Sequence, residues 1–98
     1  MTQLEAISTI EQGIVPVLNK HFRLQWEPVQ DSFVLLYPEG MVKLNASAGE
    51  ILSACDGKKS VSDISDFLEK KYPDAEGISA DVNDFFSAAK AKGWTHFV

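Results

Sequence analysis

A change of hydrophobic period within residues 35–57 constrains the fold more than any other feature of the sequence. An apolar run closes in a Pro-Glu-Gly segment at 38–40, in which Pro fixes φ and Gly permits a positive φ, as in a tight turn. Residues 41–44 are then too few for anything but a strand. The next apolar residues recur at i, i+3, i+4 and i+7, the spacing of one helical face: Ala48, Ile51, Leu52 and Cys55. The sequence therefore predicts a hairpin that leads directly into a helix.

Capping signals predict the ends of three helices. Ser47 with Glu50 three residues later is a capping-box pattern, and Asp56-Gly57 is a helix stop. A second helix is predicted to begin at Ser60, with Asp63 at its third position, and to end before Pro73. A third helix is predicted to be capped by Ser79 and to end at Gly93.

Two further apolar patterns complete a predicted sheet. Residues 22–27 alternate apolar and polar side chains, as a strand with one solvated face does. Residues 33–37 are apolar throughout, which predicts a middle strand covered on both faces. With the strand at 41–44 they make an α+β fold, a three-stranded antiparallel sheet followed by three helices, compatible with a winged helix-turn-helix-like module. The first and third strands are then the sheet edges, where another chain can add.

The two ends of the chain carry weaker patterns. We expect residues 1–14 to form a flexible arm and residues 15–98 to form a single domain, with apolar anchors such as Ile14, Val15 and Val17. An arm that is swapped or docks on a partner is the alternative. Residues 94–98 are predicted to be a short extended tail whose aromatic rings lie against the body.

Composition argues against several classes of partner. A net charge of −5 disfavours nucleic acid, because phosphate binding needs clustered Lys and Arg. No signal-peptide pattern and no membrane-spanning apolar run is visible, so we expect a cytoplasmic protein with no membrane contact. The single Cys55 fits a reducing compartment and is predicted to be a buried, inert thiol.

No catalytic arrangement stands out in the sequence. His21 and His96 lie far apart, and neither they nor Cys55 have metal-ligand spacing. Two carboxylate pairs at i, i+3 spacing could form an acid–base dyad, but helix caps and solvated faces explain them: Asp63/Asp66 and Asp81/Asp84. We therefore predict no enzymatic activity, no metal and no cofactor.

The third predicted helix has an asymmetric apolar stripe. Its centre comprises Val82, Phe86, Ala89 and Gly93. Four residues extend it on one side, namely Phe85 and Ala88 with the charged Asp81 and Lys92. The opposite flank, Asn83 and Lys90, is polar. The widened side is either one wall of a binding groove or an ordinary packing surface against the sheet or the N-terminal arm.

Several short runs resemble the PqqD family of pyrroloquinoline quinone (PQQ) biosynthesis. They are Leu-Gln-Trp-Glu at 24–27, Val-Leu-Leu-Tyr-Pro-Glu-Gly at 34–40, Leu44-Asn45, Ala48 with Ile51-Leu52, and Asp56-Gly57. The Leu-Tyr-Pro-Glu-Gly run followed by Leu-Asn is the specific part, and the resemblance extends from about Val15 to the C-terminus.

The resemblance implies a non-enzymatic carrier that recognises a short ribosomal precursor peptide and presents it to a radical-SAM enzyme. Such a peptide is expected to add as a strand to the edge of the sheet. The family implies that the third strand is this edge and that the third helix is the facing wall. The implied peptide-binding residues are Met41, Val42, Lys43 and Leu44 on the strand and Asp81, Phe85, Ala88 and Lys92 on the helix.

Two other functions compete with this interpretation. A winged-helix DNA-binding regulator would need a basic recognition helix, but residues 79–93 carry two Asp and two Lys. A subunit-interface domain without a peptide ligand is the other alternative. The sequence leaves open whether the protein is a monomer or a swapped dimer.

Overall fold

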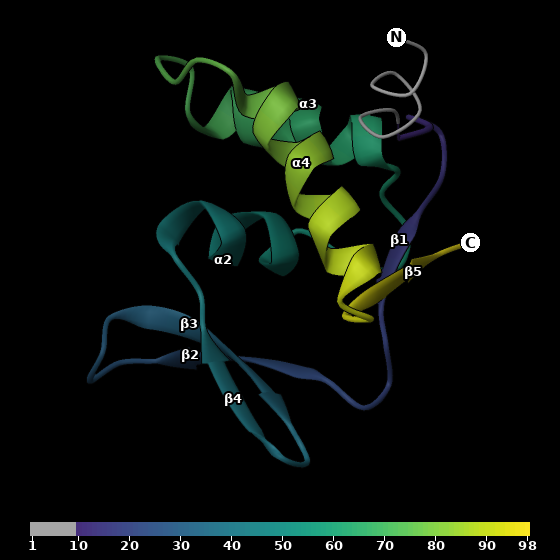
Figure 1. Cartoon of the computed structure of the whole chain (residues 1–98). Coiled ribbons are helices and arrows are strands. Elements are labelled where there is room, and N and C mark those ends of the chain that lie inside the picture. The colour runs from purple at the N-terminus through teal and green to yellow at the C-terminus, as the bar shows by residue number, and fades with distance from the viewer. Residues whose placement is uncertain (1–9) are drawn as a thin grey trace, which may run out of the picture.

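The computed structural model describes residues 10–98 and has the predicted α+β architecture. In chain order its elements are β1 (Pro16–Leu18), β2 (Arg23–Glu27), β3 (Ser32–Tyr37), β4 (Gly40–Lys43), α2 (Ala46–Ser53), α3 (Val61–Lys71), α4 (Ile78–Ala91) and β5 (Thr95–Phe97). Figure 1 shows α2 between the three-stranded sheet and the other two helices. The predicted arm, residues 1–14, lies outside the described residues as far as residue 9.

The predicted meander is confirmed, with the strand order β2-β3-β4 and antiparallel pairing throughout. Tyr37 pairs with Gly40, so Pro38 and Glu39 alone form the turn. Gly40 does not adopt a positive φ, and that part of the turn argument was wrong. Proline still restricts φ at the turn, while Gly40 already belongs to the strand.

The prediction that β3 is covered on both faces is confirmed at the centre of the strand, although a helix covers only one of the two faces. Leu35 is fully buried on the face that packs against α2. Val34 and Leu36 point to the opposite face, and none of the three described helices lies over it (Figure 1). Val34 is nevertheless buried, with Gln25 and Lys43 as its neighbours on the adjacent strands.

The cap of α2 differs from the predicted capping box. The cap is Asn45, whose Oδ1 accepts a hydrogen bond from the Ala48 amide at 2.8 Å. Asn ranks at least as high as Ser at this position, and Asn45 is the first residue able to cap after β4 ends. Glu50 instead forms an ion pair with Lys71 of α3 at 3.1 Å.

The loop from α2 to α3 is held by Asp56. Helix α2 ends at Ser53, before the predicted Asp56-Gly57 stop, and Gly57 adopts a φ of 78° within the loop. The Asp56 side chain accepts hydrogen bonds from the amides of Lys58 and Lys59. These bonds, with the Lys59 ammonium, hold the pKa of this carboxyl well below its usual range.

The first three backbone amides of α3, those of Val61, Ser62 and Asp63, all donate to an acceptor. The predicted start at Ser60 is confirmed, and Ser60 and Asp63 form a capping box. The Val61 amide donates to the Ile14 carbonyl, and the Ser62 amide donates to the Gln12 carbonyl, both at 3.0 Å. The chain before β1 therefore satisfies donors that a helix start leaves without partners. The arm boundary at residue 14 stays a prediction.

The cap of α4 also differs from the prediction. The helix begins at Ile78, one residue before the predicted cap Ser79, and follows Gly77 at a φ of 73°. Gly77 lacks a side chain, so no side-chain oxygen caps this helix. The predicted end is confirmed, since Gly93 follows the last cap residue in the left-handed region with a φ of 75°.

A second, two-stranded sheet was not predicted. Strand β1 pairs with β5 in antiparallel register, with Val17 opposite His96. Reciprocal hydrogen bonds between Val15 and Val98 extend the pairing beyond both strands. Three-residue strands give little periodicity, and Pro16 argues against a ladder position, so the sequence signal was weak. The predicted extended tail is therefore strand β5.

The core consists of two joined clusters. One lies among the three helices and includes Ile51, Ile64 and Phe86. The other lies between α2 and the sheet and consists of Leu35, Leu44 and Leu52. Phe85 and Cys55 pack against both clusters. No helix between residues 10 and 98 combines the length and the apolar character that crossing a bilayer requires.

We expect Leu52→Ala to lower the free energy of unfolding by about 2–5 kcal/mol, because the side chain is fully buried between α2 and the sheet. Ser53→Ala, at an exposed position of the same helix, is the control and should change stability by less than about 0.5 kcal/mol. Urea unfolding followed by circular dichroism measures both. Equal stability of the two variants would contradict this placement of the α2 core face.

Candidate functional site

Strand β4 presents an open edge. Within the described part of the chain it pairs with β3 alone, and the Leu44 amide donates to the Phe33 carbonyl at 3.0 Å. In an antiparallel ladder the bonded pairs alternate with non-bonded pairs. The amide of Val42 therefore faces β3, and the amide and carbonyl groups of Met41 and Lys43 face away from the sheet.

These outward groups of Met41 and Lys43 have no hydrogen-bond partner among residues 10–98. The side chains of the strand alternate: those of Val42 and Leu44 lie on the helix side, and Val42 packs against the cluster of Leu35, Leu44 and Leu52. Met41 and Lys43 lie on the open face and are exposed. Four backbone groups are therefore available to an incoming strand.

The predicted wall on α4 lies toward the sheet. Phe85 packs against the sheet cluster, with its ring 5.3 Å from the Phe86 ring and 6.4 Å from the Trp94 ring. Ala88 is exposed, and the Lys92 ammonium lies 5.4 Å from the Trp94 ring centroid. The widened stripe thus continues through Trp94, which the helical pattern alone could not include.

The opposite flank of α4 packs on the two ends of the chain. The Asn83 side chain accepts a hydrogen bond from Gln12 Nε2 at 3.0 Å. The Lys90 ammonium lies 5.6 Å from the Phe97 ring centroid in β5. The two flanks of α4 therefore have different surroundings. The polar flank packs against Gln12 and β5, whereas the widened flank lies toward the three-stranded sheet.

A groove joins the end of β4 to α4. It has a volume of about 290 Å³ and is lined by Asn45, Ser47, Ala48, Ile51, Asp81, Asp84 and Phe85. Two of the predicted site residues, Asp81 and Phe85, lie in it, and Asn45 continues directly from Leu44. The other predicted residues border the strand edge or the exposed end of α4.

Three groove residues were not predicted, namely Asn45, Ser47 and Asp84. Asn45 and Ser47 belong to the start of α2, whose position depends on the packing of the whole helix. The i, i+3 spacing of Asp81 and Asp84 was visible, but we interpreted it as a solvated face. Neither carboxylate forms an ion pair within the described part of the chain, so the groove is negatively charged.

Among residues 10–98, the titratable groups show neither a metal-binding cluster nor an activated thiol. No set of three His, Cys, Asp or Glu side chains among residues 10–98 is placed to hold a metal ion. Burial, with a smaller contribution from the neighbouring Asp56, raises the pKa of the Cys55 thiol to about 12. A thiol with such a pKa is protonated at neutral pH and is a poor nucleophile.

Comparisons with known proteins agree with this architecture. The family described as Coenzyme PQQ synthesis protein D (PqqD) matches residues 32–94. The PqqD truncation of Methylobacterium extorquens PqqCD, solved by NMR and described as a functional, stand-alone recognition element for ribosomally synthesised and post-translationally modified peptides (RiPPs), has a TM-score of 0.75 and 27% identity. The superposition covers 92% of this chain and 97% of that one.

Curated relatives match over nearly their whole length. A PqqA binding protein of Pseudomonas paraeruginosa is 52% identical over 82% of this chain and 87% of its own. A PqqA binding protein of Rahnella aquatilis is 44% identical over 91% of this chain and 94% of its own. The fold and the open strand thus define a small α+β domain of the recognition-element type. The chain belongs to the PqqD family.

We expect Cys55 to react with Ellman's reagent at pH 8 much more slowly in the native protein than in urea, because its folded pKa is about 12. Burial favours the neutral thiol, so the folded state holds this proton more tightly than the unfolded state. Stability from this group is complete below about pH 8.5 and is lost as the pH rises toward 12. Equal reaction rates in the native and unfolded protein would contradict the burial of the thiol.

Proposed function

We propose that the protein is a non-catalytic peptide chaperone of PQQ biosynthesis that binds the precursor peptide PqqA by strand addition to β4. It presents the bound peptide to a radical-SAM enzyme of the same pathway. The observation that carries the proposal is the pair of residues Met41 and Lys43, whose backbone groups face away from the sheet without partners among residues 10–98. Family membership and the names of the relatives support it.

Strand addition suits this edge for a physical reason. An extended peptide exchanges water for main-chain hydrogen bonds at Met41 and Lys43, and it displaces no strand formed by residues 10–98. The two-residue turn at Pro38 and Glu39 ends the edge on one side, and the Asn45 cap ends it on the other. The edge that is open to the peptide therefore has a defined length.

The facing wall on α4 supplies side-chain contacts. Phe85 is the apolar anchor of this wall, and Ala88 leaves room beside it because its side chain is small. Asp81 and Lys92 lie along the same flank of the helix and place charges of opposite sign at its two ends. Charges on the rim of a binding site fix the direction of a bound partner more than they add affinity.

Of the competing functions, neither has an observation in its favour. DNA binding would need a basic helix, but the net charge of residues 79–93 is zero and the Asp81 and Asp84 carboxylates lie in the groove. A subunit interface at β4 would use the same edge as the peptide, so a second copy of the chain would compete with PqqA. We propose a cytoplasmic carrier.

We expect Lys43→Pro to weaken binding of the Pseudomonas paraeruginosa PqqA peptide by about three- to tenfold, because it removes one outward amide donor. Stability should change little, since this amide donates nothing to β3. Lys43→Ala is the control for the lost charge and should bind within about twofold. Val42→Pro should instead lower the melting temperature, because it removes a ladder bond to Leu35. Calorimetric titration and thermal melts measure these effects.

The two proline variants distinguish an amide that faces the peptide, at Lys43, from an amide that faces β3, at Val42. If Lys43→Pro bound the peptide as well as Lys43→Ala does, strand addition at this amide would be wrong. A loss of stability in Lys43→Pro equal to that in Val42→Pro would show that the assigned register of β4 is wrong.

On the facing wall, we expect Lys92→Glu and Ala88→Asp to weaken PqqA binding by about two- to fivefold with little loss of stability, because both positions are exposed. Lys90→Glu is the matched control, since Lys90 also lies over an aromatic ring but on the opposite flank. Phe85→Ala should reduce both binding and stability, because the ring packs against both core clusters. Equal affinities for Lys90→Glu and Lys92→Glu would argue against the α4 wall.

A further inference from the structure

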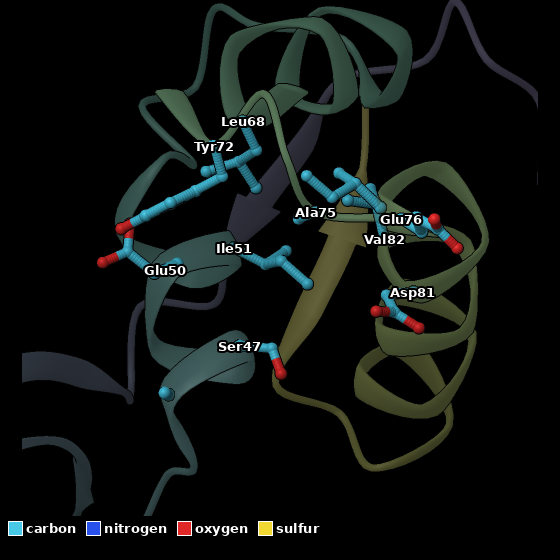
Figure 2. Close-up of a pocket in the computed structure, with 11 residues that line it drawn as sticks. Ser47, Glu50, Ile51, Leu68, Tyr72, Ala75, Glu76, Asp81 and Val82 are labelled. Carbon is cyan, nitrogen blue, oxygen red and sulfur yellow. The ribbon is translucent and has the colours of Figure 1, made fainter. Parts of the chain in front are cut away.

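A second pocket lies beyond the groove, where α2, the end of α3 and the start of α4 converge. It has a volume of about 320 Å³ and is mainly apolar. Figure 2 shows Ile51 pointing into it from α2, with Leu68 and Tyr72 on one side and Ala75 and Val82 on the other. A cavity of this size holds one or two side chains of a partner.

The rim of this pocket carries three carboxylates, of which one is already paired with a lysine. Glu50 is engaged by Lys71 at 3.1 Å, which balances its charge. Glu76 and Asp81 lie on the other side (Figure 2) and form no ion pair among residues 10–98. The start of α4 contributes a partial positive charge of about one half, which two carboxylates outweigh. The open side of the rim is therefore negative.

The pocket is continuous with the groove at the end of β4. Ser47, Ile51 and Asp81 line both. Strand β4 runs toward α2 and ends at Lys43, so an extended chain lying along its edge can continue over the groove and reach the pocket. Ser47 on α2 and Asp81 on α4 stand on opposite sides of this passage (Figure 2).

We infer that this pocket is a second subsite for the precursor peptide, which takes an apolar side chain next to a Lys or Arg of the peptide. The inference rests on the proposed function, because the occupant is the part of the peptide that extends beyond the strand paired with β4. The apolar side chain fills the space between Ile51, Leu68 and Val82. The adjacent cation lies against Glu76 and Asp81.

This subsite provides sequence selectivity, which strand addition alone lacks. Main-chain hydrogen bonds along β4 are nearly independent of sequence, so they do not fix which residues of the peptide pair with Met41 and Lys43. The pocket instead selects those positions of the peptide at which an apolar side chain has a neighbouring cation. The pocket would therefore set the register of the bound strand.

The test uses ¹⁵N-labelled protein, the Pseudomonas paraeruginosa PqqA peptide and three variants. Glu76→Lys reverses the rim charge, and Ala75→Trp fills the pocket from an exposed position. Asp74→Lys is the matched control, since Asp74 is an exposed carboxylate of the same loop that does not line the pocket. We expect Glu76→Lys and Ala75→Trp to weaken binding by about two- to tenfold and Asp74→Lys to stay within twofold.

Changes in the amide chemical shifts on addition of PqqA locate the contact. They test strand addition at β4 and binding in the pocket separately. In the unchanged protein, PqqA should shift the amides of Met41 and Lys43 and also those of Ala75 and Ile78. Shifts at β4 without shifts at the pocket would overturn the second subsite and leave strand addition intact. Shifts at neither place would overturn both.

Peptide variants test the charge of the occupant. Each Lys or Arg of PqqA is replaced in turn by Gln, and each peptide is titrated into the unchanged protein and into Glu76→Lys. One replacement should abolish the difference in affinity between the two proteins, because it removes the partner of Glu76. If the difference in affinity between the two proteins were the same for every peptide variant, no Lys or Arg of the peptide would bind at this rim.

Discussion

The packing of α2 against β3 is the contact on which the rest of the structure depends. Leu52 on the helix is buried with Leu35 and Leu44 of the sheet. The approach is close because Gly49 faces Phe33, and a Cβ at Gly49 would lie 2.8 Å from the Phe33 ring. With α2 in this place, β4 is led into the helix by the Asn45 cap, and the other helices pack on the far side of α2. The open strand edge and the α4 wall follow from that one junction.

The local elements of this arrangement could be predicted because they leave periodic signals. The change of period after Leu44 indicated the hairpin and α2, and Ser60 with Asp63 three residues later indicated the start of α3. The predicted caps at Ser47 and Ser79 were wrong because several residues near a helix start can cap it, and packing decides which one does. The β1–β5 sheet joins segments nearly eighty residues apart, and pairing of that range leaves no local pattern.

Parts of the candidate site could likewise be predicted from local patterns, and other parts could not. The asymmetric stripe of α4 was visible in the sequence, and the structure places its two flanks in different surroundings, with Phe85 toward the sheet and Asn83 toward Gln12. The register of β4 was not predictable, because the pairing of the whole β3–β4 ladder decides which of Val42 and Lys43 turns its amide toward β3, and no local pattern in the sequence encodes that pairing. The groove and pocket also escaped prediction, since their walls come from three helices that meet only in the folded chain.

Hydrogen exchange at the two sheet edges tests the central claim most directly. Met41 and Lys43 present outward amides on β4, and Leu24 and Trp26 present the equivalent amides on β2. All four are backbone donors of the same sheet, so β2 serves as an internal control for general tightening of the fold. On addition of PqqA we expect exchange to slow at Met41 and Lys43 and to stay unchanged at Leu24 and Trp26. Protection at β2 instead, or at neither edge, would contradict strand addition at β4.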